Sequence, residues 1–118
     1  MKQLACLIEV TPESGSLGRT ALNFAEACAE QGIGLWIFFY GEGVYTAYTG
    51  CITPTGEPDV RASWARLVER ADVTCVACVT AAERRGITAE HMIPGMRLGG
   101  LGEWTDAMAR VDRVVQFR

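Results

Sequence analysis

Apolar runs alternate along this chain with stretches of helical periodicity. Five short runs predict β-strands, and they cover residues 4–10, 33–40, 73–79, 96–98 and 111–117. The first is continuous apart from Glu9, which is typical of a strand covered on both faces. The second is rich in β-branched and aromatic residues, which favours a strand rather than a helix.

The segments between these runs predict helices. Apolar residues recur at helical spacing from Leu17, and Gly32 is placed to end that helix. A second helix is expected over 58–71, with Pro58 in its first turn. Shorter helices are expected over 81–85, 88–92 and 103–110.

Alternating strands and helices indicate an α/β fold. We expect a three-layer sandwich, with a mostly parallel central sheet of about five strands and helices on both faces. The 118 residues correspond to one domain, 1–118. Ligands of such sheets gather beyond the carboxyl ends of the strands. This rule selects residues 11–18, 40–45 and 78–82.

Composition narrows the function classes. Hydrophobic residues make up 49% and charged residues 21%, so disorder is excluded. The net charge of −3 argues against direct binding to a nucleic-acid backbone. No apolar segment reaches the ~20 residues that a membrane helix requires, and no signal peptide is evident. We therefore expect a cytoplasmic protein that contacts neither nucleic acid nor membrane.

Among five cysteines, Cys78 has the sequence context of a reactive thiol. It lies near a predicted strand end, just before the helix expected from Ala81, for which Thr80 is a candidate cap. Backbone amides at a helix N-terminus stabilise an anion such as a thiolate. Arg84 and Arg85 follow one to two turns later and add positive potential if they turn toward the sulfur. The alternative is an inert, buried strand residue.

Cys75 and Cys78 form a C-x-x-C pair, which raises two further possibilities. In one extended strand they would lie about 10 Å apart on opposite faces, too far for a disulfide. A strand ending at Val76 would remove this objection. A zinc site formed with His91, the single histidine, lacks a fourth ligand at the usual spacing. We therefore expect neither a metal nor a cofactor.

Four blocks of sequence stand out along the chain: FFYGEGVY at 38–45, CVTAAERRG at 78–86, GLGE at 100–103 and DRVVQF at 112–117. In this order they resemble the DsrE/TusD sulfur-relay family. Each block alone is weak evidence for the family, but four blocks in the same order are specific for it. The TusD/DsrE subunit type matches this chain better than its sister subunits do.

The resemblance implies a sulfurtransferase that carries sulfane sulfur as a persulfide on Cys78. Glu42 and Tyr45 are further candidates for the cleft, beside Thr80 and Arg84. Implied partners are sister DsrE/F/H-like (TusB/C-like) subunits or further copies of this chain, a TusA-like sulfur donor and a TusE/DsrC-like acceptor. The implied process is wobble-uridine 2-thiolation of tRNA or dissimilatory sulfur oxidation.

The chain departs from the family pattern in two places. Cys75 is an additional cysteine, and residues 46–58, which include Cys51, diverge. Two alternatives to a persulfide carrier therefore stay open. One is a non-catalytic assembly or regulatory subunit with the same fold, and the other is a dithiol oxidoreductase that uses Cys75 and Cys78.

Overall fold

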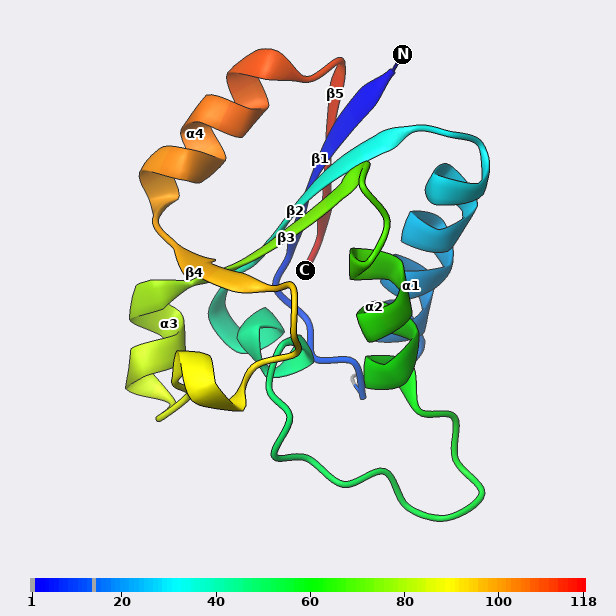
Figure 1. Ribbon diagram of the computed structural model, residues 1–118, viewed down its shortest axis with the longest axis vertical. Coiled ribbons are helices and arrows are strands. Elements are labelled where there is room, and N and C mark those ends of the chain that lie inside the picture. The colour runs from blue at the N-terminus through cyan, green and yellow to red at the C-terminus, as the bar shows by residue number, and fades with distance from the viewer. Residues whose placement is uncertain (1, 14) are drawn as a thin grey trace.

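A five-stranded parallel sheet forms the centre of the molecule (Figure 1). The computed structural model describes residues 2–13 and 15–118. Every strand pairs in parallel with its neighbours, in the order β4-β3-β2-β1-β5. The strands are β1 (Gln3–Ile8), β2 (Gly34–Phe39), β3 (Val73–Cys78), β4 (Arg97–Gly99) and β5 (Arg113–Phe117).

Helices cover both faces of the sheet, which confirms the predicted α/β sandwich. Figure 1 shows α1 and α2 together on one side of the sheet, with α3 and α4 on the other. In the described residues, no helix combines the length and the apolar character needed to cross a membrane. The α-helices are α1 (Gly15–Glu30), α2 (Val60–Val68), α3 (Val79–Arg84) and α4 (Leu101–Arg110); the 3-10 helices are η1 (Gly41–Thr46) and η2 (Ala89–His91).

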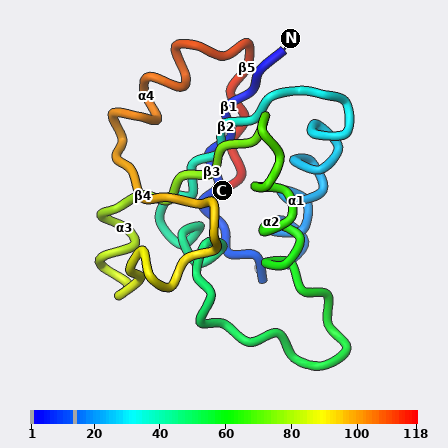
Figure 2. Tube along the Cα trace, in the orientation of Figure 1, coloured from blue at the N-terminus to red at the C-terminus, as the bar shows by residue number. Residues whose placement is uncertain are grey.

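The path of the chain places three strand ends side by side. From β1 the chain steps outward through β2 and β3 to β4, and α4 then returns it across the sheet to β5 beside β1 (Figure 2). The carboxyl ends of β2, β3 and β4 are therefore neighbours at one edge of the sheet. The segments that follow these ends are η1, α3 and α4.

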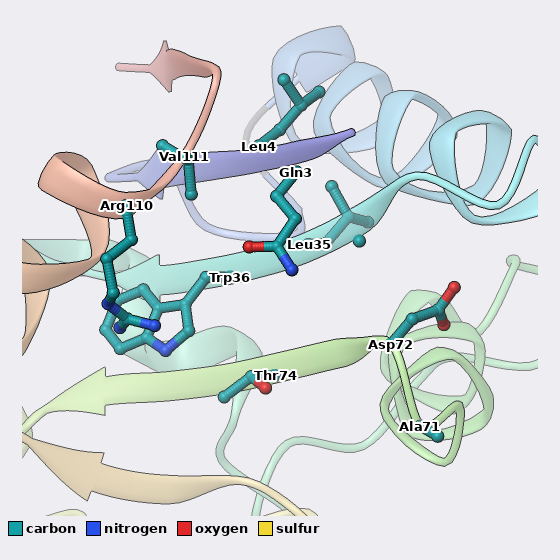
Figure 3. A pocket seen from close by; sticks show the side chains of 10 residues that line it. Gln3, Leu4, Leu35, Trp36, Ala71, Asp72, Thr74, Arg110 and Val111 are labelled. Carbon is teal, nitrogen blue, oxygen red and sulfur yellow. The ribbon is translucent and has the colours of Figure 1, made fainter. Parts of the chain in front are cut away.

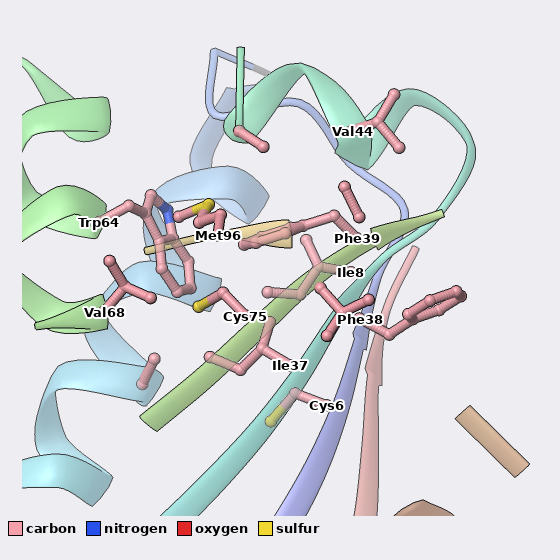
Figure 4. Close-up of a cluster of buried hydrophobic side chains, with 14 of the residues drawn as sticks. Cys6, Ile8, Ile37, Phe38, Phe39, Val44, Trp64, Val68, Cys75 and Met96 are labelled. Atoms are coloured by element: carbon pink, nitrogen blue, oxygen red, sulfur yellow. The ribbon is translucent and has the colours of Figure 1, made fainter. Parts of the chain in front are cut away.

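The core on the α1/α2 side is apolar and closely packed. Phe39 of β2 meets Trp64 of α2 edge to face, with ring centroids 5.3 Å apart. Cys75 lies on this same side of the sheet, near Trp64 and Val68 (Figure 4). Cys6 of β1 shares that face, because Ile37 of β2 is its register partner and also that of Cys75.

The opposite face of β2 carries a row of aromatic rings. Trp36 and Phe38 of β2 lie on this face, Tyr40 just after the strand stacks on Phe38, and Trp104 of α4 packs against Trp36 and Phe38. Phe38 lies near parallel to Trp104, at a centroid distance of 6.0 Å and 15° between planes. We call these four residues the aromatic row. Together they bury the α4 side of the sheet.

The predicted starts of α2, α3 and α4 were wrong; α4 begins at Leu101 instead of residue 103. The starts of α2 and α3 have local reasons. Asp59 caps α2 by accepting a hydrogen bond from the Ala62 amide at 3.1 Å, so Pro58 precedes the helix instead of opening it. Helix α3 begins at Val79, directly after β3. Thr80 consequently lies inside α3, and Cys78 itself occupies the cap position.

The 3-10 helix η1 was not predicted, and it packs tightly against β1. A Cβ atom at Gly43 would overlap the carbonyl oxygen of Ile8. Buried Arg61 of α2 also holds η1, since its Nε donates to the Tyr45 carbonyl at 2.9 Å. The same guanidinium pairs with Glu13 in the loop after β1. Three separate segments therefore meet at Arg61.

Candidate functional site

Cys78 lies where β3 ends and α3 begins. It is the last residue of the strand and the cap residue of the helix, and Gly99 of β4 is its register partner. This position is at the carboxyl edge of the sheet, as the sequence predicted. Two neighbouring strands reach the same edge, so the thiol lies among the segments that follow three strand ends.

A cavity of about 370 Å³ opens at this point, and Cys78 lines it. The segments after β2, β3 and β4 each contribute to its wall. The lining residues are Tyr40, Gly41, Cys78, Thr80, Ala81, Arg84, Arg85, Gly100 and Leu101. Cys78 is only 4% exposed, so the cavity is its route of contact with other molecules.

The alternation of β3 separates Cys78 from Cys75. Cys75 is on the α1/α2 side of the sheet (Figure 4). Cys78 instead lines the cavity. Both residues lie within the continuous strand Val73–Cys78, so the geometry assumed from the sequence holds. A disulfide between them would require β3 to unravel, because three extended steps exceed the reach of a disulfide.

The remaining cysteines have different surroundings. Cys6, Cys28 and Cys75 are buried in the core as Cys78 is, but they do not line its cavity. Burial raises the pKa of Cys6 to about 12, and the nearby Cys28 adds to this effect. Burial likewise raises the pKa of the Cys75 thiol. Such thiols stay protonated at neutral pH and are poor nucleophiles. Cys51 is exposed in the loop between η1 and α2.

The structure brings two of the four further candidates to Cys78. Thr80 and Arg84 line its cavity. Glu42 does not line it and instead approaches Arg85, with Oε1 3.9 Å from Nη2. Tyr45 lies farther along η1, where its carbonyl accepts the hydrogen bond from Arg61. Glu42 thus touches the site through Arg85, while Tyr45 helps to fix η1.

Sequence reasoning missed the wall formed by Gly100 and Leu101. These residues follow β4, and the rule that selected the ends of β2 and β3 applies equally there. The three-residue length of β4 weakened the signal. Conversely, residues of the selected segment 11–18 lie elsewhere: Pro12, Glu13 and Gly15 line a groove of about 630 Å³ beside Cys51.

A further cavity, of about 430 Å³, lies at the opposite edge of the sheet. Gln3, Trp36, Asp72 and Thr74 line it near the amino ends of β1, β2 and β3, with Arg110 of α4 (Figure 3). It contains no cysteine among its described lining residues.

Potential metal ligands are not grouped in the described part of the chain. Across residues 2–13 and 15–118, no three histidine, cysteine or acidic side chains are placed to hold a metal ion. His91 is in η2, exposed, with Nδ1 3.1 Å from the Thr88 hydroxyl.

Comparison with known proteins assigns this fold and chain to a family. The model of the DsrE/DsrF-like family matches residues 2–117. The chain belongs to this family. A protein from Aliivibrio fischeri named sulfurtransferase TusD homolog is 36% identical over 119 residues, covering 90% of this chain and 92% of the relative. Sulfurtransferase TusD of Yersinia pestis is 37% identical over 125 residues, covering 95% of each chain.

Solved structures share the DsrE/DsrF-like fold. The crystal structure of the ychN protein from E. coli superposes with a TM-score of 0.88 at 22% identity, covering 99% of this chain and 100% of that one. A protein of unknown function from Methanobacterium thermoautotrophicum, MTH1491, gives 0.76 at 12% identity, with coverage of 98% and 99%. At these identities the likeness concerns the fold.

Proposed function

We propose that this protein is a sulfurtransferase that carries sulfane sulfur as a persulfide on Cys78. The observation that supports this proposal is that Cys78, although only 4% exposed, lines a cavity at the carboxyl edge of the sheet, whereas Cys6, Cys28 and Cys75 do not line it. The proposal is supported by the relatives named sulfurtransferase TusD. It assigns to Cys78 the chemistry that their names state.

Loading is a thiol exchange at sulfur. The Cys78 thiolate attacks the outer sulfur of a donor persulfide, and a new sulfur–sulfur bond forms as the donor's sulfur–sulfur bond breaks. The donor leaves as a thiolate and takes up the proton that its persulfide carried. Cys78 then holds one additional sulfur atom. No external oxidant or reductant is consumed, because one persulfide replaces another.

Delivery repeats the exchange in the other direction. The acceptor thiol passes its proton to the outer sulfur, the acceptor thiolate attacks that sulfur, and Cys78 leaves as the thiolate. This step needs the outer sulfur to be reachable. The cavity is larger than one added sulfur atom, so it leaves room for a group of the donor or acceptor. Half-exposed Leu101 at its wall offers such a partner an apolar contact.

The partners proposed for this relay are proteins that bear thiols. A TusA-like protein supplies the sulfur and a TusE/DsrC-like protein receives it, with sister subunits or further copies of this chain completing the assembly. The sulfur then serves wobble-uridine 2-thiolation of tRNA or sulfur oxidation. The same exchange at Cys78 serves either process.

Replacing the proposed carrier residue tests the function directly. Cys78→Ser is expected to abolish loading from a persulfide-bearing cysteine desulfurase, measured by intact mass as the gain of one sulfur atom. Cys51→Ser removes an exposed thiol outside the cavity and serves as the matched control; it is expected to load like the parent.

Three outcomes would contradict the proposal that Cys78 carries the sulfur. Full loading of the Cys78→Ser protein would place the sulfur elsewhere. A parent protein that acquires no sulfur, and whose Cys78 reacts as slowly as the core thiols, would favour the non-catalytic subunit. Loading that disappears in Cys75→Ala while that variant stays folded would favour the dithiol alternative.

A further inference from the structure

The charged residues that line the Cys78 cavity are all positive. Arg84 and Arg85 both contribute to it, and its described lining residues include no carboxylate. The chain as a whole carries a net charge of −3, so this local excess of positive charge differs from the average surface. A cavity of this kind favours negatively charged groups.

The two arginines are not equivalent, because Arg85 is already engaged. Its Nη1 donates to the Ala81 carbonyl at 3.0 Å, and its Nη2 lies 3.9 Å from Glu42. Glu103 of α4, another nearby acid, pairs with Arg97 of β4 at 2.6 Å. Glu42 and Glu103 are thus directed to other arginines.

Arg84 has no such partner within the described chain. Its side chain is exposed, and none of the ion pairs formed by described residues includes it. Helix α3 has only six residues, so its dipole contributes at most a fraction of a charge at Cys78. The guanidinium of Arg84 carries a whole charge. It is therefore the strongest uncompensated charge at the cavity.

We propose that Arg84 makes the cavity selective for anions, so that Cys78 reacts preferentially with negatively charged partners and its persulfide is held as the terminal sulfur anion. For its natural ligand this inference rests on the proposed function. The ligand class is then an anionic sulfane-sulfur group.

A positive charge at Arg84 would stabilise an anionic persulfide on Cys78. A persulfide loses its proton more readily than the parent thiol, so the loaded site holds a negative sulfur at neutral pH. An opposite charge beside it favours the loaded form without forming a covalent bond. The flexible Arg84 side chain, on an exposed helix turn, can follow the outer sulfur as partners come and go.

Alkylation by two reagents of similar size tests the selectivity without any sulfur transfer. Iodoacetate is an anion and iodoacetamide is neutral, yet both react with the same thiolate by displacing iodide. The two rates at Cys78 are followed by peptide mass spectrometry on the folded full chain. Both rates scale with the fraction of Cys78 that is thiolate and with its accessibility, so their ratio depends on neither. What remains is the effect of charge at the cavity.

Arg84→Gln is expected to lower the iodoacetate-to-iodoacetamide ratio at Cys78 roughly three- to tenfold at low salt. Arg84→Lys should restore most of the ratio, since it keeps the charge. High salt should reduce the parent's ratio toward that of Arg84→Gln. Arg113→Gln in β5 removes an equal charge away from the cavity and should leave the ratio unchanged. Exposed Cys51 in the same samples provides an internal control.

The outcomes separate this inference from the proposed function. An unchanged ratio in Arg84→Gln, or no labelling of Cys78 by either reagent in the folded protein, overturns the role of Arg84. Sulfur loading, measured in parallel by intact mass, decides the carrier function by itself. A charge-dependent ratio with no loading would retain the anion-selective cavity and reject the persulfide relay.

Discussion

At the scale of single residues, the same side chain takes different roles according to its place on a strand. Cys75 and Cys78 are three positions apart in β3, yet one packs beside Trp64 and the other lines the cavity. Period-two alternation and the strand end account for this difference. A reactive thiol in this chain thus depends on register as much as on residue type.

Gly43 shows the same dependence on place. Gly43→Ala is expected to lower the free energy of unfolding by about 1–3 kcal/mol, because the new methyl group would overlap the Ile8 carbonyl and push η1 away from β1. Urea denaturation measures the change. Gly102→Ala in α4 is the matched control, since a methyl group added there would point into open space. We expect that control to be neutral or stabilising by up to about 1 kcal/mol, and equal losses in both variants would contradict the packing argument.

At the scale of elements, Arg61 joins α2, η1 and the loop that follows β1. Its guanidinium is largely buried, and it bonds the Tyr45 carbonyl and the Glu13 carboxylate. Residues separated by 16 and 48 positions are thereby held together. Because η1 follows the β2 end that forms one wall of the Cys78 cavity, Arg61 stabilises the surroundings of the site from outside it.

Arg61→Met is expected to lower the free energy of unfolding by about 1–3 kcal/mol, since the Tyr45 carbonyl loses its charged donor. Arg66→Met removes an exposed arginine from the same helix and should change stability by no more than about 0.5 kcal/mol. Chemical denaturation of the three proteins gives the comparison. Similar values for the two variants would show that the bonds at Arg61 contribute little.

The order of the elements could be predicted from the sequence, but several of their ends could not. Apolar runs located all five strands. For the inner strands β1, β2 and β3 the reason is that a strand covered on both faces has few polar residues, whereas the edge strands β4 and β5 are more exposed. The start of α3 depends on backbone geometry directly after Cys78, and small residues there gave no sign of it. The 3-10 helix η1 depends on contacts with β1 and Arg61, which are distant in sequence.

The candidate site was predictable to a similar degree. Cys78, Thr80 and Arg84 follow one strand end and share one local segment, so they could be grouped from the sequence. Leu101 comes from α4, after the shortest strand. The different roles of Arg84 and Arg85 depend on Glu42, whose approach to α3 is a tertiary contact.

At the scale of the whole molecule, buried thiols couple stability to alkaline pH. The pKa of Cys6 is raised to about 12 in the folded protein, while the unfolded thiol ionises near 8.5. The stabilisation is fully present below about pH 8.5 and is lost as the pH rises toward 12. At pH 10 the loss from one such thiol is about 2 kcal/mol.

Urea denaturation at pH 7.5 and at pH 10 measures this loss. Cys6→Ala is expected to be less stable than the parent at the lower pH because it leaves a small cavity. Its further decline between the two pH values should be smaller than the parent's, by about 2 kcal/mol. Parallel declines in the two proteins would contradict the raised pKa of Cys6.

The aromatic row gives the molecule an intrinsic optical label. The indoles of Trp36 and Trp104 are 6.2 Å apart, close enough for their excited states to couple, and Tyr40 ends the row in the wall of the Cys78 cavity. Leu101, in the same wall, lies one helical turn before Trp104. Movement of that wall when a ligand or partner protein enters the cavity would therefore change the near-ultraviolet circular dichroism of the native chain. This signal needs no attached dye.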